Sequence, residues 1–367
     1  MNKLREYFNE IENQVKNVYD IAVKAKQNSS DPKNNVEIPL AKDMAERVEG
    51  LVSAIAPQIL NTGIPNRITA LEKTYGKLDW RVALTIALEV AQEKFCKFKD
   101  KREAMEVGIR VGFAYITVGV VASPLEGFVK LQLKKRKDGK EYFCLFYSGP
   151  VRSAGGTGAS VSVLIADHIR KKFGYSIYDP TDIEIKRAYT ELTDYHEKVT
   201  NLQYFPSEEE VNFLIENLPV QIDGDPSEKY DVSNYKDLER IEANRIRNGF
   251  CLVVAECLCQ KAPKLLKQLS KWGKEFELED WDFLDKFVKL QKRMKAREKT
   301  LEDTSGEKLK PDYVFIKDLV GGRPIITQPL RTGGLRLRYG RSRTSGLSSM
   351  SIHPATMIIL NNYKLNF

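Results

Sequence analysis

The sequence predicts a helix-rich, multidomain α+β protein, and three observations carry that prediction. Apolar residues recur at helical spacing near the amino terminus and again between residues 207 and 300. Between these regions, strand-like apolar runs lead into a glycine-rich turn and then into a helical pattern. The 367 residues, 42% hydrophobic and 29% charged, are enough for two or three domains with ordinary cores, which excludes disordered and fibrous classes.

The first predicted element is a docking helix, assigned to residues 1–30. Apolar residues at alternating steps of four and three place one stripe along it, namely Leu4, Phe8, Ile11, Val15, Val18 and Ala22. The polar segment QNSSDPKNN then separates this helix from a helical region at 39–104. Within that region we expect helices from Lys42 to Leu60 and from Asp79 to Phe98.

An α+β unit is predicted at 105–200. Its strands are expected in FAYITVGVV, GFVKLQL and EYFCLFY as a small antiparallel sheet, with Asp138 and Gly139 forming a two-residue hairpin turn. The segment ASVSVLIADHIRKKFG then has apolar residues four apart, and Gly174 is expected to end that helix.

A second helical region is predicted at 201–305. Ser207 and Glu210 form a capping box, and long helical patterns follow from Tyr235 to Leu269 and from Asp280 to Lys299. The acidic segment at 223–228 lacks the glycine and glutamate of a calcium loop and is interpreted as a solvated turn. Three residues near the start of the long helix are left open between ion pairs and phosphate contacts: Glu242, Arg245 and Arg247.

Cysteine and histidine usage gives no catalytic or metal site. The five cysteines are odd in number, and Cys257 and Cys259 stand two apart in a helical pattern, so we expect reduced core thiols. No C-x-x-C motif or Cys/His cluster suits zinc. His168, His196 and His353 lack a paired nucleophile, and His168 is expected in a surface or core role.

The glycine-rich turn is a candidate anion-binding loop. Glycines between a strand and a helix let backbone N–H groups converge where a helix already favours anions, and the candidate residues are Arg152, Gly155, Gly156, Thr157 and Gly158. The turn is not a Walker loop, because Ala159 stands where that motif needs lysine. The competing interpretation is a tight strand-to-helix turn required by close packing.

Positive charge is concentrated after Asp318, where no acidic residue follows and +7 of the formal +8 resides. Guanidinium groups suit phosphate oxygens, so we expect DNA binding by Arg323, Arg331, Arg336, Arg338, Arg341 and Arg343. The alternation in LRLRY indicates a strand with two arginines on one face, in a β-rich basic domain at 313–367 that we expect to be truncated. The alternative is a charged surface paired with acids elsewhere.

Long blocks of this sequence strongly resemble the N-terminal part of the large subunit of archaeal family D DNA polymerase (DNA polymerase II). They run in order from about residue 40 to 357 as YSGPVRSAGGTGAS, LPVQIDGDPSEKYDVSNYKDLERIEANRIRNGFCLVVAECLCQKAPKL, GGRPIITQPLRTGGLRLRYGRSRTSG and IHPATM. The ending IILNNYKLNF departs from the family's expected text. The resemblance implies a replicative two-subunit enzyme whose small subunit is a 3′ to 5′ exonuclease, and the α+β unit resembles a KH-type module.

The resemblance implies magnesium and structural zinc for the complete enzyme, with none expected in this chain. The catalytic aspartates and zinc cysteines of the family lie farther along than Phe367. The expected partners are primer-template DNA, the small subunit and the remainder of the large subunit. No signal peptide or membrane-spanning run occurs, so we expect a cytoplasmic location. The alternatives are a stand-alone nucleic-acid-binding or scaffold protein, and a nucleotide-binding enzyme using the glycine-rich turn.

Overall fold

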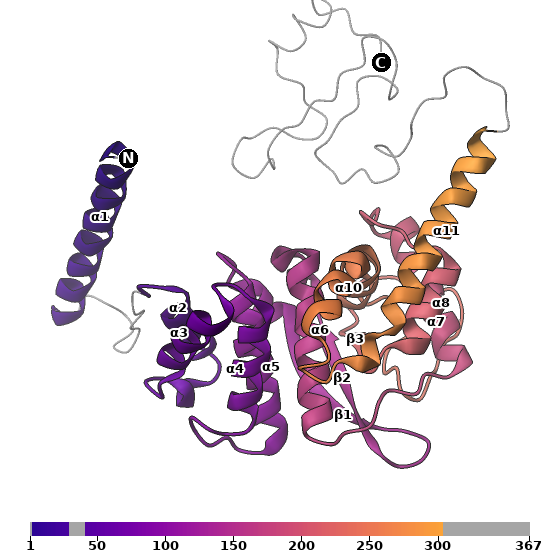
Figure 1. The fold of residues 1–367 in the computed structure, drawn as a ribbon, viewed down its shortest axis with the longest axis horizontal. Helices are drawn as coiled ribbons and strands as arrows, with labels where there is room; N and C mark the ends of the chain where they lie inside the picture. Colours follow the sequence, from indigo (N-terminus) through magenta and orange to yellow (C-terminus); the bar gives the residue numbers. More distant parts are fainter. Residues whose placement is uncertain (1, 29–40, 304–367) are drawn as a thin grey trace, which may run out of the picture. The chain divides into compact units, whose positions relative to one another are not determined.

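A computed structural model describes residues 2–28 and 41–303 (Figure 1). Its contacts divide the chain into two compact units, one of residues 1–42 and one that begins at Asp43. In the first unit, α1 (Asn2–Gln27) confirms the predicted helix. Its apolar stripe is exposed within that unit, with Leu4 at 64% and Phe8 at 59%, so docking by this helix stays a prediction.

The second unit begins with short helices that are started by capping aspartates. Asp43, Asp79 and Asp100 each accept a backbone N–H of the helix that follows, which satisfies donors that the first turn leaves free. The helices are α2 (Met44–Val52), η1 (Pro57–Ile59), α3 (Ile64–Tyr75), α4 (Trp80–Ala91) and α5 (Lys101–Ile116). The helices expected from Lys42 and Asp79 are therefore present and shorter than predicted.

The strand predicted in FAYITVGVV is wrong, because those residues begin inside the last turn of α5. This helix is buried on nearly all sides, so its carboxyl end has the continuous apolar text that also typifies a central strand. Gly108 brings α5 close to α4, since a Cβ there would lie 2.5 Å from the Ala87 carbonyl oxygen. Burial of α5, rather than the periodicity of a strand, explains the apolar run at the carboxyl end of this helix.

The sheet has three strands in the order β1 (Phe128–Lys135), β2 (Glu141–Tyr147) and β3 (Gln221–Gly224). The first pair is antiparallel as expected, whereas β3 comes from a distant segment and lies parallel to β2. The predicted two-residue turn is wrong in detail, because Arg136 donates to the Lys140 carbonyl across a three-residue loop. Only Gly139 in that loop has a positive φ, of 82°.

Both faces of β2 are buried, and its side chains alternate between two apolar clusters. Phe143, Leu145 and Tyr147 join the main core, in which α5 and α6 (Gly155–Lys172) contact the sheet. The helix predicted after the glycine-rich turn is thus confirmed, and Gly174 follows it with a φ of 75°. The main core contains buried apolar residues of elements from α2 to α11, while Tyr142, Cys144, Phe146 and Tyr178 form the second cluster. The predicted internal domain boundaries stay predictions.

Among the remaining helices, η4 (Val253–Cys259) and α10 (Gln260–Trp272) contact α6 directly. The predicted capping box at Ser207 is confirmed, and the structure forms a second capping box at Thr181. The long helix expected from Tyr235 is wrong over its first part, because Tyr235 and Asp237 have positive φ and the helix begins only at Asn248. The elements are α7 (Asp182–Lys198), α8 (Glu208–Asn217), α9 (Asn248–Leu252), η4 (Val253–Cys259), α10 (Gln260–Trp272), η5 (Glu279–Trp281) and α11 (Phe283–Asp303).

Pro263 explains one cross-link between α10 and α11. Proline has no N–H, so the Cys259 carbonyl one turn earlier loses its ordinary helical donor. The Gln291 amide of α11 donates to that carbonyl at 2.9 Å and replaces the missing bond. This contact fixes the start of α10 against α11 (Figure 1).

Candidate nucleic-acid interface

The glycine-rich turn joins β2 to α6 through a 3-10 segment, η3 (Gly149–Ala154). Gly155 has a φ of 70°, which only glycine adopts without strain. A Cβ on Gly156 would lie 2.5 Å from the Glu256 carbonyl oxygen and 2.7 Å from the Lys261 Cε. Close packing of η4 and α10 therefore requires glycine here, as the structural interpretation of this turn supposed.

Arg152 is held by an ion pair at this turn. Its Nη2 lies 3.0 Å from the Glu256 carboxylate, which also accepts the Gln203 backbone N–H at 2.9 Å. The Arg152 side chain remains 33% exposed, and Thr157 accepts a hydrogen bond from the Lys264 ammonium at 3.3 Å. The structure thus brings the predicted loop residues together beside α10, and phosphate binding by this loop stays a prediction.

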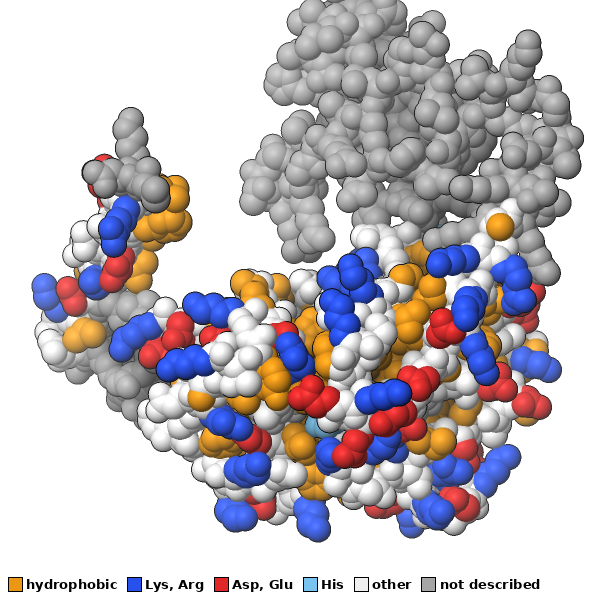
Figure 2. All heavy atoms as spheres, in the orientation of Figure 1, with side chains coloured by type: hydrophobic (Ala, Val, Ile, Leu, Met, Phe, Trp, Pro, Cys, Tyr) orange, Lys and Arg blue, Asp and Glu red, His pale blue; other side chains and the backbone are white. Residues whose placement is uncertain are grey.

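A row of lysines on α10 adjoins this turn, and sequence reasoning missed it. Lys261, Lys264, Lys267 and Lys271 stand three, three and four residues apart, which places them on one helix face. Three of the four are exposed, and α10 contains no acidic residue. We call these four residues the α10 lysine face, and Figure 2 shows blue side chains gathered over α10 and the neighbouring part of α11. Their spacing was the signal that could have found them.

Two hollows border α11. One, of about 400 Å³, lies between α10 and α11 and is lined by Pro263, Leu266, Lys267, Val288, Gln291 and Lys292. The other, of about 620 Å³, lies between α8 and α11 and is lined by Glu209, Asn212, Phe213, Glu216, Lys286, Lys289, Leu290 and Arg293. Both have apolar floors and charged rims, but neither gathers the buried, convergent polar groups that a small-molecule site needs.

A buried ion cluster corrects one prediction and decides, for Arg247, between two interpretations that the sequence left open. Asp223 was expected in a solvated turn, but it sits in β3 at 1% exposure. Arg247 contacts Asp223 at 2.5 Å and Glu191 at 2.6 Å, while Lys134 contacts Asp223 at 2.9 Å. Arg187 also pairs with Glu191, at 3.1 Å. Of the three residues left open in the sequence, Arg247 is thus a buried structural residue.

Charge pairing keeps this cluster ionised in spite of its burial. Removal from water alone would raise the pKa of Asp223, but the charges of Arg247 and Lys134 hold that pKa below its ordinary value. Burial likewise opposes ionisation of Arg247, yet Glu191 and Asp223 raise the pKa of its guanidinium. The cluster joins β1, β3, α7 and the start of α9, so it fixes four segments that lie far apart in the sequence.

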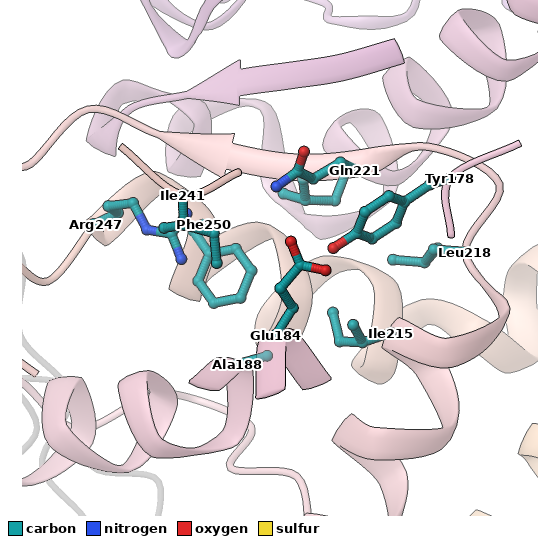
Figure 3. A pocket seen from close by; sticks show the side chains of 10 residues that line it. Tyr178, Glu184, Ala188, Ile215, Leu218, Gln221, Ile241, Arg247 and Phe250 are labelled. Atoms are coloured by element: carbon teal, nitrogen blue, oxygen red, sulfur yellow. The ribbon is translucent and has the colours of Figure 1, made fainter. Parts of the chain in front are cut away.

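A small cavity beside this cluster holds no substrate site. It is lined by ten side chains, nine of which Figure 3 labels, including Tyr178, Glu184, Gln221 and Arg247. Its volume of about 20 Å³ corresponds to roughly one water molecule. Arg240 pairs with Asp179 and with Glu184, which lines the cavity, and its guanidinium lies over the Tyr142 and Tyr178 rings.

His168 is a core histidine, one of the two roles that the sequence indicated. Its Nδ1 lies 2.8 Å from the Phe276 carbonyl oxygen, and burial lowers its pKa from 6.5 to about 4. The unfolded chain therefore takes up this proton first as the pH falls. Stability from this residue is complete above about pH 6.5 and declines until about pH 4.

We predict that His168→Gln flattens the pH dependence of the free energy of unfolding between pH 4 and 6.5. The lowered pKa corresponds to about 3 kcal/mol across that window. Urea unfolding at several pH values checks this, and equal pH dependence in the variant and the parent chain would contradict it.

Within residues 2–28 and 41–303, no three His, Cys, Asp or Glu side chains converge as a metal site. No metal-dependent catalytic step is assigned to these described residues, and the magnesium and zinc that the resemblance implies stay expectations. In the same ranges, no helix has the length and apolar character needed to cross a membrane. The predicted DNA-binding residues Arg323, Arg331, Arg336, Arg338, Arg341 and Arg343 lie outside the described residues, as does His353.

The fold and this surface define a helix-rich α+β protein with a basic face suited to a polyanion. The family model described as DNA polymerase II large subunit DP2, N-terminal, matches residues 6–290, and the model of its central domain matches 301–365. The chain belongs to the family of DNA polymerase II large subunits. This confirms the resemblance read from the sequence, and the match to residue 365 includes most of the ending that had been expected to depart.

Curated relatives agree with this family. The DNA polymerase II large subunit of Nanoarchaeum equitans is 44% identical over 96% of this chain, and that of Methanosarcina barkeri is 42% identical over 99%. The Pyrococcus horikoshii subunit is 37% identical over 98% of the chain. The chain spans 30% of the length of the first two relatives and 26% of the third.

Proposed function

We propose that this chain works within a replicative DNA polymerase, where it binds the DNA backbone and contributes to subunit assembly. The observation that carries the proposal is the family match through both the N-terminal and the central models. The charge distribution adds physical support, because the segment after Asp318 has seven basic and no acidic residues and the α10 lysine face is a second basic region. Phosphate contacts of this kind bind DNA without sequence specificity.

Template-directed synthesis itself is assigned to the rest of the enzyme. Nucleotidyl transfer needs metal-held carboxylates around an incoming triphosphate, and the described residues supply no such group. The proposal therefore includes the remainder of the large subunit with its magnesium and structural zinc. It also includes a small subunit with 3′ to 5′ exonuclease activity, in a cytoplasmic heterodimer that acts on primer-template DNA.

We predict that replacing Arg336, Arg338, Arg341 and Arg343 by Ala weakens binding to primer-template DNA equally for unrelated sequences. Each lost phosphate contact removes about 0.9 from the slope of log affinity against log salt concentration, so four contacts flatten it by about 3 to 4. Titrations of the full chain with labelled duplex at several salt concentrations measure that slope.

The matched control replaces Lys73, Lys77, Lys99 and Lys101 by Ala. These lysines are exposed and form no ion pair within the described residues, and their replacement removes the same number of positive charges from residues 73–101. The control is expected to keep most of the slope. Equal slopes of log affinity against log salt concentration for the arginine variant and the parent chain would contradict DNA-backbone binding by these arginines.

A further inference from the structure

We propose that the α10 lysine face is a second contact surface for a nucleic-acid phosphodiester backbone, separate from the arginines after Asp318. The inference rests on the proposed function and names a part of the chain that would carry it. It begins from the charges of Lys261, Lys264, Lys267 and Lys271.

The lysines of this face are not neutralised as some other lysines of residues 41–303 are. On α6, for example, Lys171 pairs with Glu279 and Lys172 with Glu277. On α10, Lys264 reaches only the Thr157 hydroxyl, and the other three have no ion pair among residues 41–303. Four like charges on one face repel one another, and an external polyanion relieves that repulsion.

The face has the length and the rigidity that a backbone contact needs. Ten residues separate Lys261 from Lys271, which is about 15 Å along a helix. One strand of DNA carries a phosphate per roughly 3.4 Å of axis, so the row spans about four phosphates. The opposite side of α10 is anchored by buried Ala262, Leu265 and Trp272, and the Gln291 contact holds its start.

The surroundings favour a nucleic acid over an acidic amphipathic peptide. A peptide of that kind would place its apolar side on the floor of the hollow between α10 and α11 and its acids on the rim. Of the four lysines, only Lys267 lines that hollow. The row instead continues along α10 towards the first turn of α6, where Lys261 packs on Gly156 and Lys264 meets Thr157. The positive charges therefore lie in a row along the axis of α10 and do not surround the apolar floor of the hollow.

The test replaces the four lysines of the face by Gln in the full chain, and by Arg in a second variant that keeps the charge. If all four contact phosphates of a duplex, the Gln variant lowers the salt slope of DNA affinity by about 3 to 4, and the Arg variant retains the slope. The control again replaces Lys73, Lys77, Lys99 and Lys101, here by Gln, and keeps the parental slope. The Gln variant's circular dichroism and unfolding midpoint are expected to match the parent's, because three of the replaced side chains are exposed.

The outcomes separate this inference from the function it rests on. If the parent chain binds DNA and the Gln variant behaves like the control, the inference is overturned while the proposed function stands. If the parent chain shows no salt-dependent DNA binding at all, the proposed function fails, and the inference fails with it. If the Gln variant keeps its DNA affinity and loses co-purification with the other polymerase subunits, the face is a protein contact and the inference is overturned.

Discussion

Replacing Arg247 by Met is expected to lower the free energy of unfolding by about 3 to 5 kcal/mol. Arg247 lies at 1% exposure between Glu191 and Asp223, both equally buried. Methionine fills much of the space but leaves two carboxylates in the interior, with Arg187 and Lys134 as their remaining cationic partners. The cost comes from buried carboxylate oxygens that lose their charge-assisted hydrogen bonds to Arg247 rather than from lost packing, so it exceeds that of an ordinary surface substitution.

Urea unfolding of the full chain measures this change. Arg245→Met is the control, because Arg245 is exposed and only two positions away, and a change within about 0.5 kcal/mol is expected there. A loss below about 1 kcal/mol for Arg247→Met would show that the cluster does not depend on this guanidinium.

Replacing Gly249 by Ala is expected to destabilise the chain by about 3 kcal/mol, at the upper end of the range for overpacking. A Cβ at Gly249 would lie 2.0 Å from the Tyr147 carbonyl oxygen and 2.5 Å from the Ser148 backbone nitrogen. Backbone atoms cannot rotate away as side chains do, so α9 would have to move off the end of β2. That movement would also shift Arg247, which precedes α9.

Gly158→Ala serves as the control, because its added Cβ would meet side-chain carbons at 3.3 Å and its φ is not positive. Alanine also favours the first turn of α6 by up to about 1 kcal/mol over glycine, so little net change is expected. Thermal and urea unfolding of both variants provide the comparison. Equal midpoints for Gly249→Ala and the parent chain would show that α9 does not approach β2 so closely.

Local patterns predicted much of the fold. The α1 stripe, the capping box at Ser207, the hairpin around Gly139 and the helix after the glycine-rich turn all involve residues near one another in the sequence. The failures have a common physical origin in tertiary burial. The end of α5 has the sequence pattern of a strand because the core surrounds it. The segment after Tyr235 has a helical pattern, but its turns are stabilised by hydrogen bonds such as that from the Asp237 backbone N–H to the Asn244 side chain.

The buried ion cluster was less predictable because its residues come from distant segments. Asp223, Glu191 and Arg247 meet only when β3, α7 and α9 assemble, so the acids looked solvated in the sequence. The α10 lysine face lies on a single helix and could have been found from its spacing, but the six arginines after Asp318 dominated the charge count. DNA binding by those arginines remains a prediction.

Primer extension by a reconstituted enzyme tests the central claim most directly. The remainder of the large subunit and the small subunit would be purified with and without this chain, and nucleotide incorporation on a primed template would be measured. We predict that the chain co-purifies with both partners and that its omission abolishes or strongly reduces incorporation. Undiminished incorporation in its absence, or failure to co-purify, would contradict a role in the polymerase and leave a free nucleic-acid-binding protein.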